Sequence, residues 1–198
     1  MSHRPAPTDI DIHPLIAGRW SSRAYAADKP VAHEDVVALL EAARWAPSAY
    51  NVQPWRFVVF EKSADSAAFE RAFATLVPFN QSWNANAQVL FAVLADTLTA
   101  KGTANPTAAY DAGAAAMALL LQAHAKDLAA HSMSGFDANA FREAFAIPER
   151  FTPIAMISVA HHGDAKGLPE ALAEREQAPR ARLPMGDLAH FGAWTQAG

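Results

Sequence analysis

The stretch at residues 44–57, RWAPSAYNVQPWRF, constrains the chain most, because two prolines bracket a short polar loop within it. Pro47 ends the preceding helical pattern, since a proline disfavours helical backbone in the residue before it. After Pro54, an apolar run begins at Trp55 and predicts a strand. The loop carries one hydroxyl and two side-chain amides, from Ser48, Asn51 and Gln53. A rigid loop with these groups suits a flat heterocycle with alternating donors and acceptors. An ordinary helix–loop–strand corner is the alternative.

Apolar periodicity predicts a mixed α and β chain. Helical spacing predicts helices at 13–19, 34–46, 67–76, 108–128, 138–145 and 169–176. Nearly continuous apolar runs predict strands at 55–60, 89–95 and 153–160, and 128–136 is expected to be extended with a turn at Gly135. We expect the strand at 55–60 to be buried on both faces. The alanine-rich 108–128 helix is predicted to be central, and it suits either a subunit contact or a single-chain core.

Composition narrows the class of protein. The length of 198 residues predicts one domain, and a net charge of -4 argues against a general nucleic-acid binder. The chain has no cysteine, which excludes disulfides and thiolate chemistry. The longest alanine- and leucine-rich run, 112–121, is shorter than the ~20 residues that a membrane span needs. With no apolar run at the N-terminus to suggest a signal peptide, we expect a cytoplasmic protein.

A basic stretch, RWSSR at residues 19–23, is a candidate phosphate site. In an extended backbone Arg19, Ser21 and Arg23 would point the same way. Two guanidiniums flanking a hydroxyl suit a phosphate, because arginine donates parallel charge-assisted hydrogen bonds. The alternative is a solvated basic turn.

Two further polar stretches contain candidate ligands. The segment at 79–84 is dense in amides, and Asn80 in it is either a ligand or part of a helix cap or Asx turn. Gly135 lets the main chain approach a planar ring closely. The adjacent pair His161 and His162 would face opposite ways on a strand, so we predict no metal site there.

The C-terminal tail, residues 164–198, is predicted to hold only one short helix. Such a tail is unusual in a compact domain unless it wraps something. It contains Arg180 and Arg182, and then the aromatic residues Phe191 and Trp194. Taken alone, these residues are equally typical of a surface tail with scattered basic side chains.

These separated stretches, in their order and spacing, resemble the nitroreductase family of FMN flavoenzymes. The shared patterns are APSxxNxQPWxF, RxSxR and RxRxP, with GFD as a weaker match. The resemblance implies an α+β fold with a small, mostly antiparallel sheet surrounded by helices. It also implies an intertwined homodimer in which 1–198 is a single FMN-binding domain and 164–198 wraps the partner subunit.

The resemblance also implies which residues bind FMN. From one subunit these would be Arg19, Ser21, Arg23, Asn80, Ser134, Gly135, Arg180 and Arg182, with the four arginines around one phosphate. Trp20 and Met133 are further FMN-binding candidates. From its partner they would be Pro47, Ser48, Ala49 and Asn51. Trp83 is a candidate border of the substrate pocket. No residue is predicted to be catalytic itself, because the flavin N5 would carry the chemistry, and no metal is predicted.

The chemistry implied by the resemblance is ping-pong hydride transfer. NAD(P)H would reduce the flavin, and a nitroaromatic, quinone or similar small oxidant would reoxidise it. FMN is preferred over FAD, since the chain lacks a dinucleotide fingerprint. Two alternatives remain. The same scaffold can serve dehydrogenation, dehalogenation or flavin chemistry, or the chain can be a non-enzymatic α+β interaction module.

Overall fold

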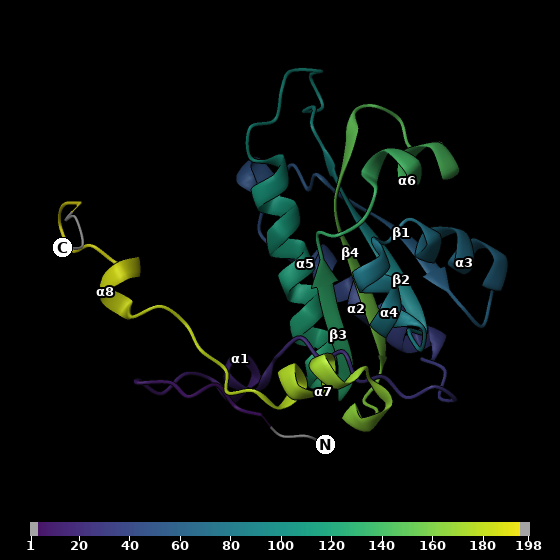
Figure 1. Cartoon of the computed structure of the whole chain (residues 1–198). Helices are drawn as coiled ribbons and strands as arrows, with labels where there is room; N and C mark the ends of the chain where they lie inside the picture. Colours follow the sequence, from purple (N-terminus) through teal and green to yellow (C-terminus); the bar gives the residue numbers. More distant parts are fainter. Residues whose placement is uncertain (1–3, 195–198) are drawn as a thin grey trace.

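A four-stranded antiparallel sheet with strand order β1-β2-β4-β3 forms the centre of the fold (Figure 1). The structure is a computed structural model that describes residues 4–194. Residues 1–3 and 195–198, the ends of the predicted polar lead and tail, lie outside the described residues. The strands are β1 (Trp55–Glu61), β2 (Val89–Asp96), β3 (Leu128–Met133) and β4 (Phe151–His161). The predicted α+β class with a small antiparallel sheet is confirmed.

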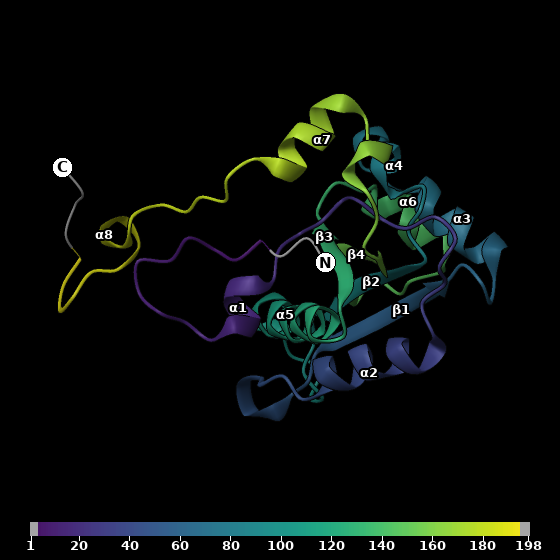
Figure 2. The same ribbon diagram turned by 90° about the horizontal axis from the view of Figure 1, so that it is seen from below.

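Helices cover both faces of the sheet (Figure 2). Because side chains alternate along a strand, odd-numbered residues of β2 join one core cluster and even-numbered residues join the other. The first cluster contains residues of α2 (His33–Arg44) and α5 (Ala108–Ala125). The second contains residues of α3 (Ser66–Ala74), α4 (Pro78–Asn84) and α6 (Ala138–Ala144). The sheet is therefore the middle of three layers.

The chain ends carry short elements outside these layers. They are α1 (Pro14–Gly18), η2 (Ala165–Gly167), α7 (Glu170–Gln177) and α8 (Met185–Leu188). In both views the segment with α8 extends away from the body of the molecule, on the same side as the N-terminal arm (Figures 1 and 2). Within residues 164–194 the tail contains two helices and a 3-10 turn, where one helix was predicted.

Three other predictions need correction. The strand buried on both faces is β2, whereas β1 is an edge strand with an exposed Arg56. The 108–128 helix ends at Ala125, because Asp127 has a left-handed φ of 57° that a helix cannot contain. Asn80 lies in α4, which begins with a proline at its first position, instead of in an Asx turn.

Within residues 4–194, no helix combines the length and the apolar character that crossing a membrane requires.

Candidate flavin site

The polar loop, residues 47–53, has a strained backbone that its own polar groups hold. It contains the 3-10 turn η1 (Ala49–Asn51), and Tyr50, Asn51 and Gln53 have φ values of 51°, 57° and 51°. Asparagine tolerates this region, but for tyrosine and glutamine it is costly. The Gln53 N–H donates to Ser48 Oγ at 3.0 Å, and Gln53 Nε2 donates to the Asn51 carbonyl at 3.1 Å. Strain of this kind persists where surrounding contacts determine the backbone.

A buried carboxylate fixes the far side of the polar loop to the core. The Ala49 N–H donates to Asp111 Oδ2 at 3.2 Å, and Thr107 Oγ1 donates to the same oxygen at 2.9 Å. Asp111 lies near the start of α5 and is 3% exposed. It is the one charged residue in the sequence 108–125, which is the signal that sequence reasoning overlooked.

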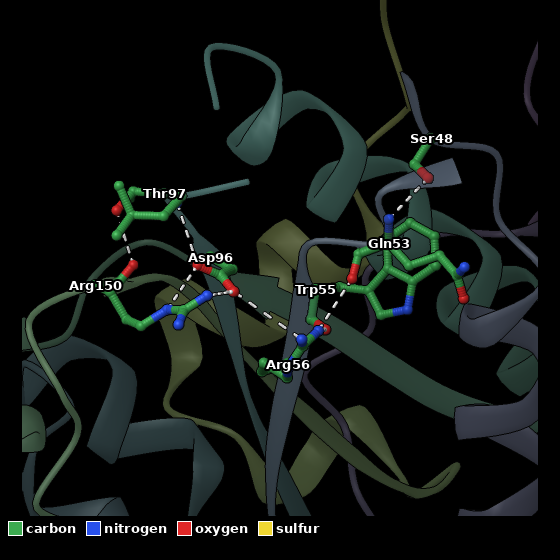
Figure 3. Close-up of polar contacts among 8 residues, drawn as sticks. Ser48, Gln53, Trp55, Arg56, Asp96, Thr97 and Arg150 are labelled. Atoms are coloured by element: carbon green, nitrogen blue, oxygen red, sulfur yellow. Dashed lines mark hydrogen bonds and ion pairs between the residues drawn. The ribbon is translucent and has the colours of Figure 1, made fainter. Parts of the chain in front are cut away.

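The exit of the polar loop is clamped by a charge network on β1 and β2 (Figure 3). Arg56 Nη1 donates to the Gln53 carbonyl at 3.0 Å and to the Trp55 carbonyl at 2.7 Å. Arg56 also lies 4.0 Å from Asp96, which accepts two hydrogen bonds from Arg150, at 3.0 and 2.6 Å. Burial alone would raise the pKa of Asp96, but the Arg150 bonds hold it below its ordinary value.

Three predicted phosphate ligands form the arginine group: Arg19, Arg180 and Arg182. All three line a cavity of about 810 Å³ between the N-terminal arm and the C-terminal tail. Ser21 joins them, because Arg19 Nη1 donates to Ser21 Oγ at 3.4 Å. Burial, and then the charges of Arg180 and Arg182, lower the pKa of Arg19. Burial and neighbouring arginines likewise lower the pKa of Arg180.

The fourth predicted arginine lies apart from this group. The Arg23 guanidinium is 5.7 Å from the ring centroid of Trp83, and its Nε is buried without a hydrogen-bond partner in the part of the chain that the structure describes. His131, on β3, lies 4.6 Å from the same indole ring and bonds the Ser22 carbonyl at 3.3 Å. Burial, and then Arg23, lower the pKa of His131 to about 4. His131 was not among the predicted site residues.

Trp83 lies in the hydrophobic core, and Trp20 lies at a second cavity. Trp83 is 3% exposed and belongs to the core cluster beneath α4, so it is a core residue and not a pocket border. Trp20 lies beneath Arg4, 4.7 Å from guanidinium carbon to ring centroid. It lines a second cavity together with Ser22 and Ala24. The predicted alternation is thus seen for Arg19 and Ser21, whereas Trp20 and Ser22 line the second cavity and Arg23 lies over Trp83.

The turn after β3 is joined to α4 by a close contact. Asn80 Nδ2 donates to the Gly135 carbonyl at 2.8 Å, and a Cβ added at Gly135 would lie 2.6 Å from that nitrogen. Glycine is therefore required for this approach. Met133 is buried and accepts from Asn84 Nδ2 through its sulfur at 3.0 Å, whereas Ser134 is exposed. The structure thus groups Asn80 with Met133, Ser134 and Gly135, as predicted.

The polar loop and the arginine group lie at opposite ends of α5. Gly18, next to Arg19, packs against His124 near the end of the helix, where an added Cβ would be 2.6 Å from His124 Nε2. The polar loop bonds Asp111 near its start. Thirteen residues of helix separate the two contacts, which is roughly 20 Å at 1.5 Å per residue. The two parts of the predicted site are thus anchored at different points along α5, and Met117, between these points, also lines the cavity of the arginine group.

No cluster of three or more metal-ligating side chains occurs among residues 4–194. The pair His161 and His162 lies at the end of β4, as predicted.

Comparison with known proteins identifies the family. The sequence profile described as "Nitroreductase family" matches residues 16–161. A Mycolicibacterium smegmatis relative, "Uncharacterized 15.4 kDa protein in ask 5'region", is 35% identical over 144 residues, which cover 70% of this chain and 97% of that protein. The "Major NAD(P)H-flavin oxidoreductase" of Aliivibrio fischeri is 40% identical over 72 residues, 35% of this chain and 33% of that protein. The chain belongs to the nitroreductase family.

A solved structure described as "The crystal structure of the oxidoreductase containing FMN" has the same fold over nearly its whole length. Its TM-score is 0.90 at 36% identity, and the match covers 97% of each chain. The similarity therefore extends beyond the matched family segment into both chain ends, where the arginine group lies.

Proposed function

We propose that this chain binds FMN and acts as an NAD(P)H-dependent oxidoreductase that reduces nitroaromatics, quinones or similar small oxidants. The arginine group carries the proposal. Its three guanidiniums line one cavity, and within residues 4–194 no ion pair joins any of them to a carboxylate. Arg19 and Arg180 are partly buried and Arg182 is exposed. Neighbouring cations that repel one another favour an anionic ligand, and the planar fork of arginine matches a phosphate.

The remaining residues fit the flavin ring. Among residues 4–194, Arg23 Nε is a buried donor without a partner, and at Gly135 an added Cβ would collide with Asn80. Arg23 follows Ser21 on the same segment, on the side toward which we expect a ring attached to the bound phosphate to extend. The family match and the FMN and NAD(P)H in the names of the similar proteins support the same cofactors.

We infer that the active form is a homodimer, with each site shared between subunits. In one chain the polar loop and the arginine group are anchored at contacts roughly 20 Å apart along α5, so we expect one FMN to meet the arginine group of one subunit and the polar loop of the other. A second copy would supply the missing loop. Tyr50 is fully exposed at 102%, and Phe191 and Trp194 on the tail are 94% and 81% exposed. Exposed aromatics of this kind are typical of an interface.

The protein's own part in the reaction is binding and orientation. Bound FMN supplies hydride transfer between NAD(P)H and the oxidant. Arg19, Ser21 and Arg182 hold the phosphate, and Arg23 meets the ring. The partner subunit's Ser48 and the partner subunit's Asn51 orient the ring from the other side, on a loop whose strain fixes its shape. No general base is needed for this role.

The test is a spectrum of the purified protein, before and after anaerobic addition of NADH or NADPH. We expect a flavin band near about 450 nm that bleaches with one or both nicotinamides and returns with a nitroaromatic or a quinone. Flavin released by heat should be FMN by chromatography, and light scattering should give a dimer. A protein that binds no flavin when supplied with FMN, or that releases FAD, would overturn the proposal.

A further inference from the structure

Glu176 is a buried carboxylate that joins the C-terminal α7 to the segment carrying the predicted phosphate ligands. It is 4% exposed. Its Oε1 accepts hydrogen bonds from Ser22 Oγ at 2.6 Å, from the Arg23 N–H at 2.9 Å and from the Ala24 N–H at 3.3 Å. One oxygen thus holds three consecutive residues of a segment more than 150 positions away.

Burying this carboxylate lowers the stability of the fold, which indicates that the side chain has a specific role. Its second oxygen, Oε2, is buried and has no hydrogen-bond partner among the described residues. A buried polar atom without a partner costs folding free energy. An apolar residue here would avoid that cost, but it could not accept the bonds from Ser22, Arg23 and Ala24. The three bonds are therefore what the position provides.

Arg180, four residues further on, complements Glu176. Its Nη1 donates to the Ala17 carbonyl at 2.8 Å and to the Arg4 carbonyl at 2.6 Å, and its Nη2 donates to the Arg19 carbonyl at 2.8 Å. Three of the five guanidinium donors are thus used on the main chain. Glu176 accepts from N–H groups at one end of the 17–24 segment, and Arg180 donates to carbonyls at the other.

Glu176 holds the side of this segment that faces away from the arginine group, because Glu176 lines the second cavity together with Ser22 and Ala24. Ser22 is 2% exposed, donates to Glu176 and accepts from the Ala24 N–H at 3.2 Å. Because the segment alternates, fixing Ser22 on this side turns Arg19, Ser21 and Arg23 to the other. Glu176 therefore influences the orientation of ligands that it does not itself contact.

We propose that Glu176 is a positioning residue for flavin binding, which holds residues 22–24 so that Arg19, Ser21 and Arg23 meet the cofactor together. The inference rests on the proposed function in that the ligand is FMN. It predicts that hydrogen-bond acceptance at position 176, and not negative charge there, supports FMN affinity.

The test compares Glu176→Ala and Glu176→Gln with Glu174→Ala, a matched control at an exposed position of the same helix. FMN is titrated into each apoprotein at a temperature where circular dichroism shows all of them folded. We expect Glu176→Ala to weaken FMN binding about tenfold, since three hydrogen bonds to the segment are lost. Glu176→Gln keeps an acceptor oxygen and should stay within about threefold of wild type. Glu174→Ala should not change the affinity.

Ser22→Ala tests the inference even if Glu176→Ala does not fold, and it completes a double-mutant cycle if Glu176→Ala does fold. Ser22→Ala removes the 2.6 Å bond alone and should weaken FMN binding about threefold in the wild type. In the Glu176→Ala background the same change should have no further effect, because the two residues act as one unit. Unchanged affinity in Ser22→Ala would overturn the inference.

Other outcomes separate the inference from the proposed function. Equal shifts in Glu176→Ala and Glu176→Gln would mean that only the charge matters, and would overturn the inference alone. Wild-type affinity in Glu176→Ala would do the same. If the wild type binds no FMN, the proposed function fails, and the inference fails with it.

Discussion

The polar loop and the arginine group belong to one predicted site, yet they are held in place in different ways. The hydrogen bonds that shape the loop at Gln53 join it to Ser48, Asn51 and Arg56, at most five positions away. The bonds that shape the arginine group join Arg180 to Ala17, 163 positions away. The loop is therefore specified mainly by its own sequence, whereas the arginine group forms only when the two chain ends meet.

This difference gives the two regions different sensitivities. Bringing distant segments together costs more chain entropy than closing a short turn. The arginine group adds electrostatic repulsion, which contributes to the lowered pKa values of Arg19 and Arg180. A ligand that binds only the folded state stabilises it by mass action. We therefore expect FMN to stabilise the chain ends more than the polar loop.

The largest effect is expected from deleting residues 179–198, which removes Arg180, Arg182 and the exposed tail aromatics. FMN affinity should fall more than about a hundredfold, because each charge-assisted hydrogen bond contributes ~1.5–3 kcal/mol. The dimer should dissociate as well. Absorbance of the purified protein and light scattering measure both results. Hydrogen exchange of residues 47–53 in the apoprotein should change little, and a truncated protein that stays dimeric and yellow would contradict the comparison.

The next largest effect is expected from lowering the pH, which should affect the stability of the two regions differently. The pKa of His131, which bonds the Ser22 carbonyl, is lowered to about 4 by burial and by Arg23. The unfolded chain therefore binds this proton more readily, so stability is full above an ordinary pKa of ~6.5 and falls as the pH drops toward 4. From pH 7.5 to 4.5 we expect a loss of roughly 2–3 kcal/mol in the free energy of unfolding.

The control for this pH effect is His131→Gln, which keeps a donor for the Ser22 carbonyl and cannot titrate. Its free energy of unfolding, from urea titrations, should lack this part of the pH dependence. Asp96, which supports the polar loop, has a lowered pKa, so its contribution is lost only at lower pH, as the pH falls below the ordinary carboxyl range. If the free energy of unfolding depends on pH equally in wild type and His131→Gln, protonation of His131 does not account for the loss of stability in acid.

A smaller effect should distinguish cofactor affinity from turnover. Arg182→Ala should weaken FMN binding by about ten- to a hundredfold, through loss of charge-assisted bonds worth ~1.5–3 kcal/mol. Excess FMN should restore most of its turnover, because the phosphate is distant from the reacting part of the ring. Asn51→Ala, in the polar loop, should stay slow at saturating FMN. Titrations and steady-state rates test both, with exposed Arg175→Ala as the charge-matched control.

Two outcomes would contradict this assignment. One is an Arg182→Ala protein that keeps stoichiometric FMN through gel filtration. The other is an Arg182→Ala protein that stays as slow as Asn51→Ala with saturating FMN. Arg182→Lys should be intermediate in affinity, because it keeps the charge and loses the fork.

The features that could be predicted from the sequence are those that depend on local contacts, and the features that could not be predicted depend on long-range contacts. The polar loop, the alternation of Arg19 and Ser21, and the approach at Gly135 depend on local backbone, so a motif contains enough information to predict them. The burial of Trp83, the separation of Arg23 from Arg182 and the bonds of Glu176 depend on long-range packing. No spacing in the sequence reports those contacts. Asp111 is intermediate, because a lone charge in an apolar helix could have been noticed.

The smallest predicted effect concerns the exit of the polar loop. Arg56 donates to the Gln53 and Trp55 carbonyls, but its side chain is 53% exposed and it lies 4.0 Å from Asp96. Water competes for such bonds, so we expect Arg56→Ala to lower stability by only about 0.5–1.5 kcal/mol. The Gln53 carbonyl is then held less firmly, and the strained backbone before it opens more often. Amide hydrogen exchange at 51–53 should therefore speed up about fivefold, since ~1 kcal/mol corresponds to that factor. Turnover at saturating FMN should fall more than FMN affinity does.

Arg44→Ala is the matched control, because Arg44 is an exposed arginine near the loop that pairs with Glu41. If the two variants exchange equally at 51–53, the clamp at Gln53 does not support the loop, and its shape depends on Ser48 and Asp111 alone.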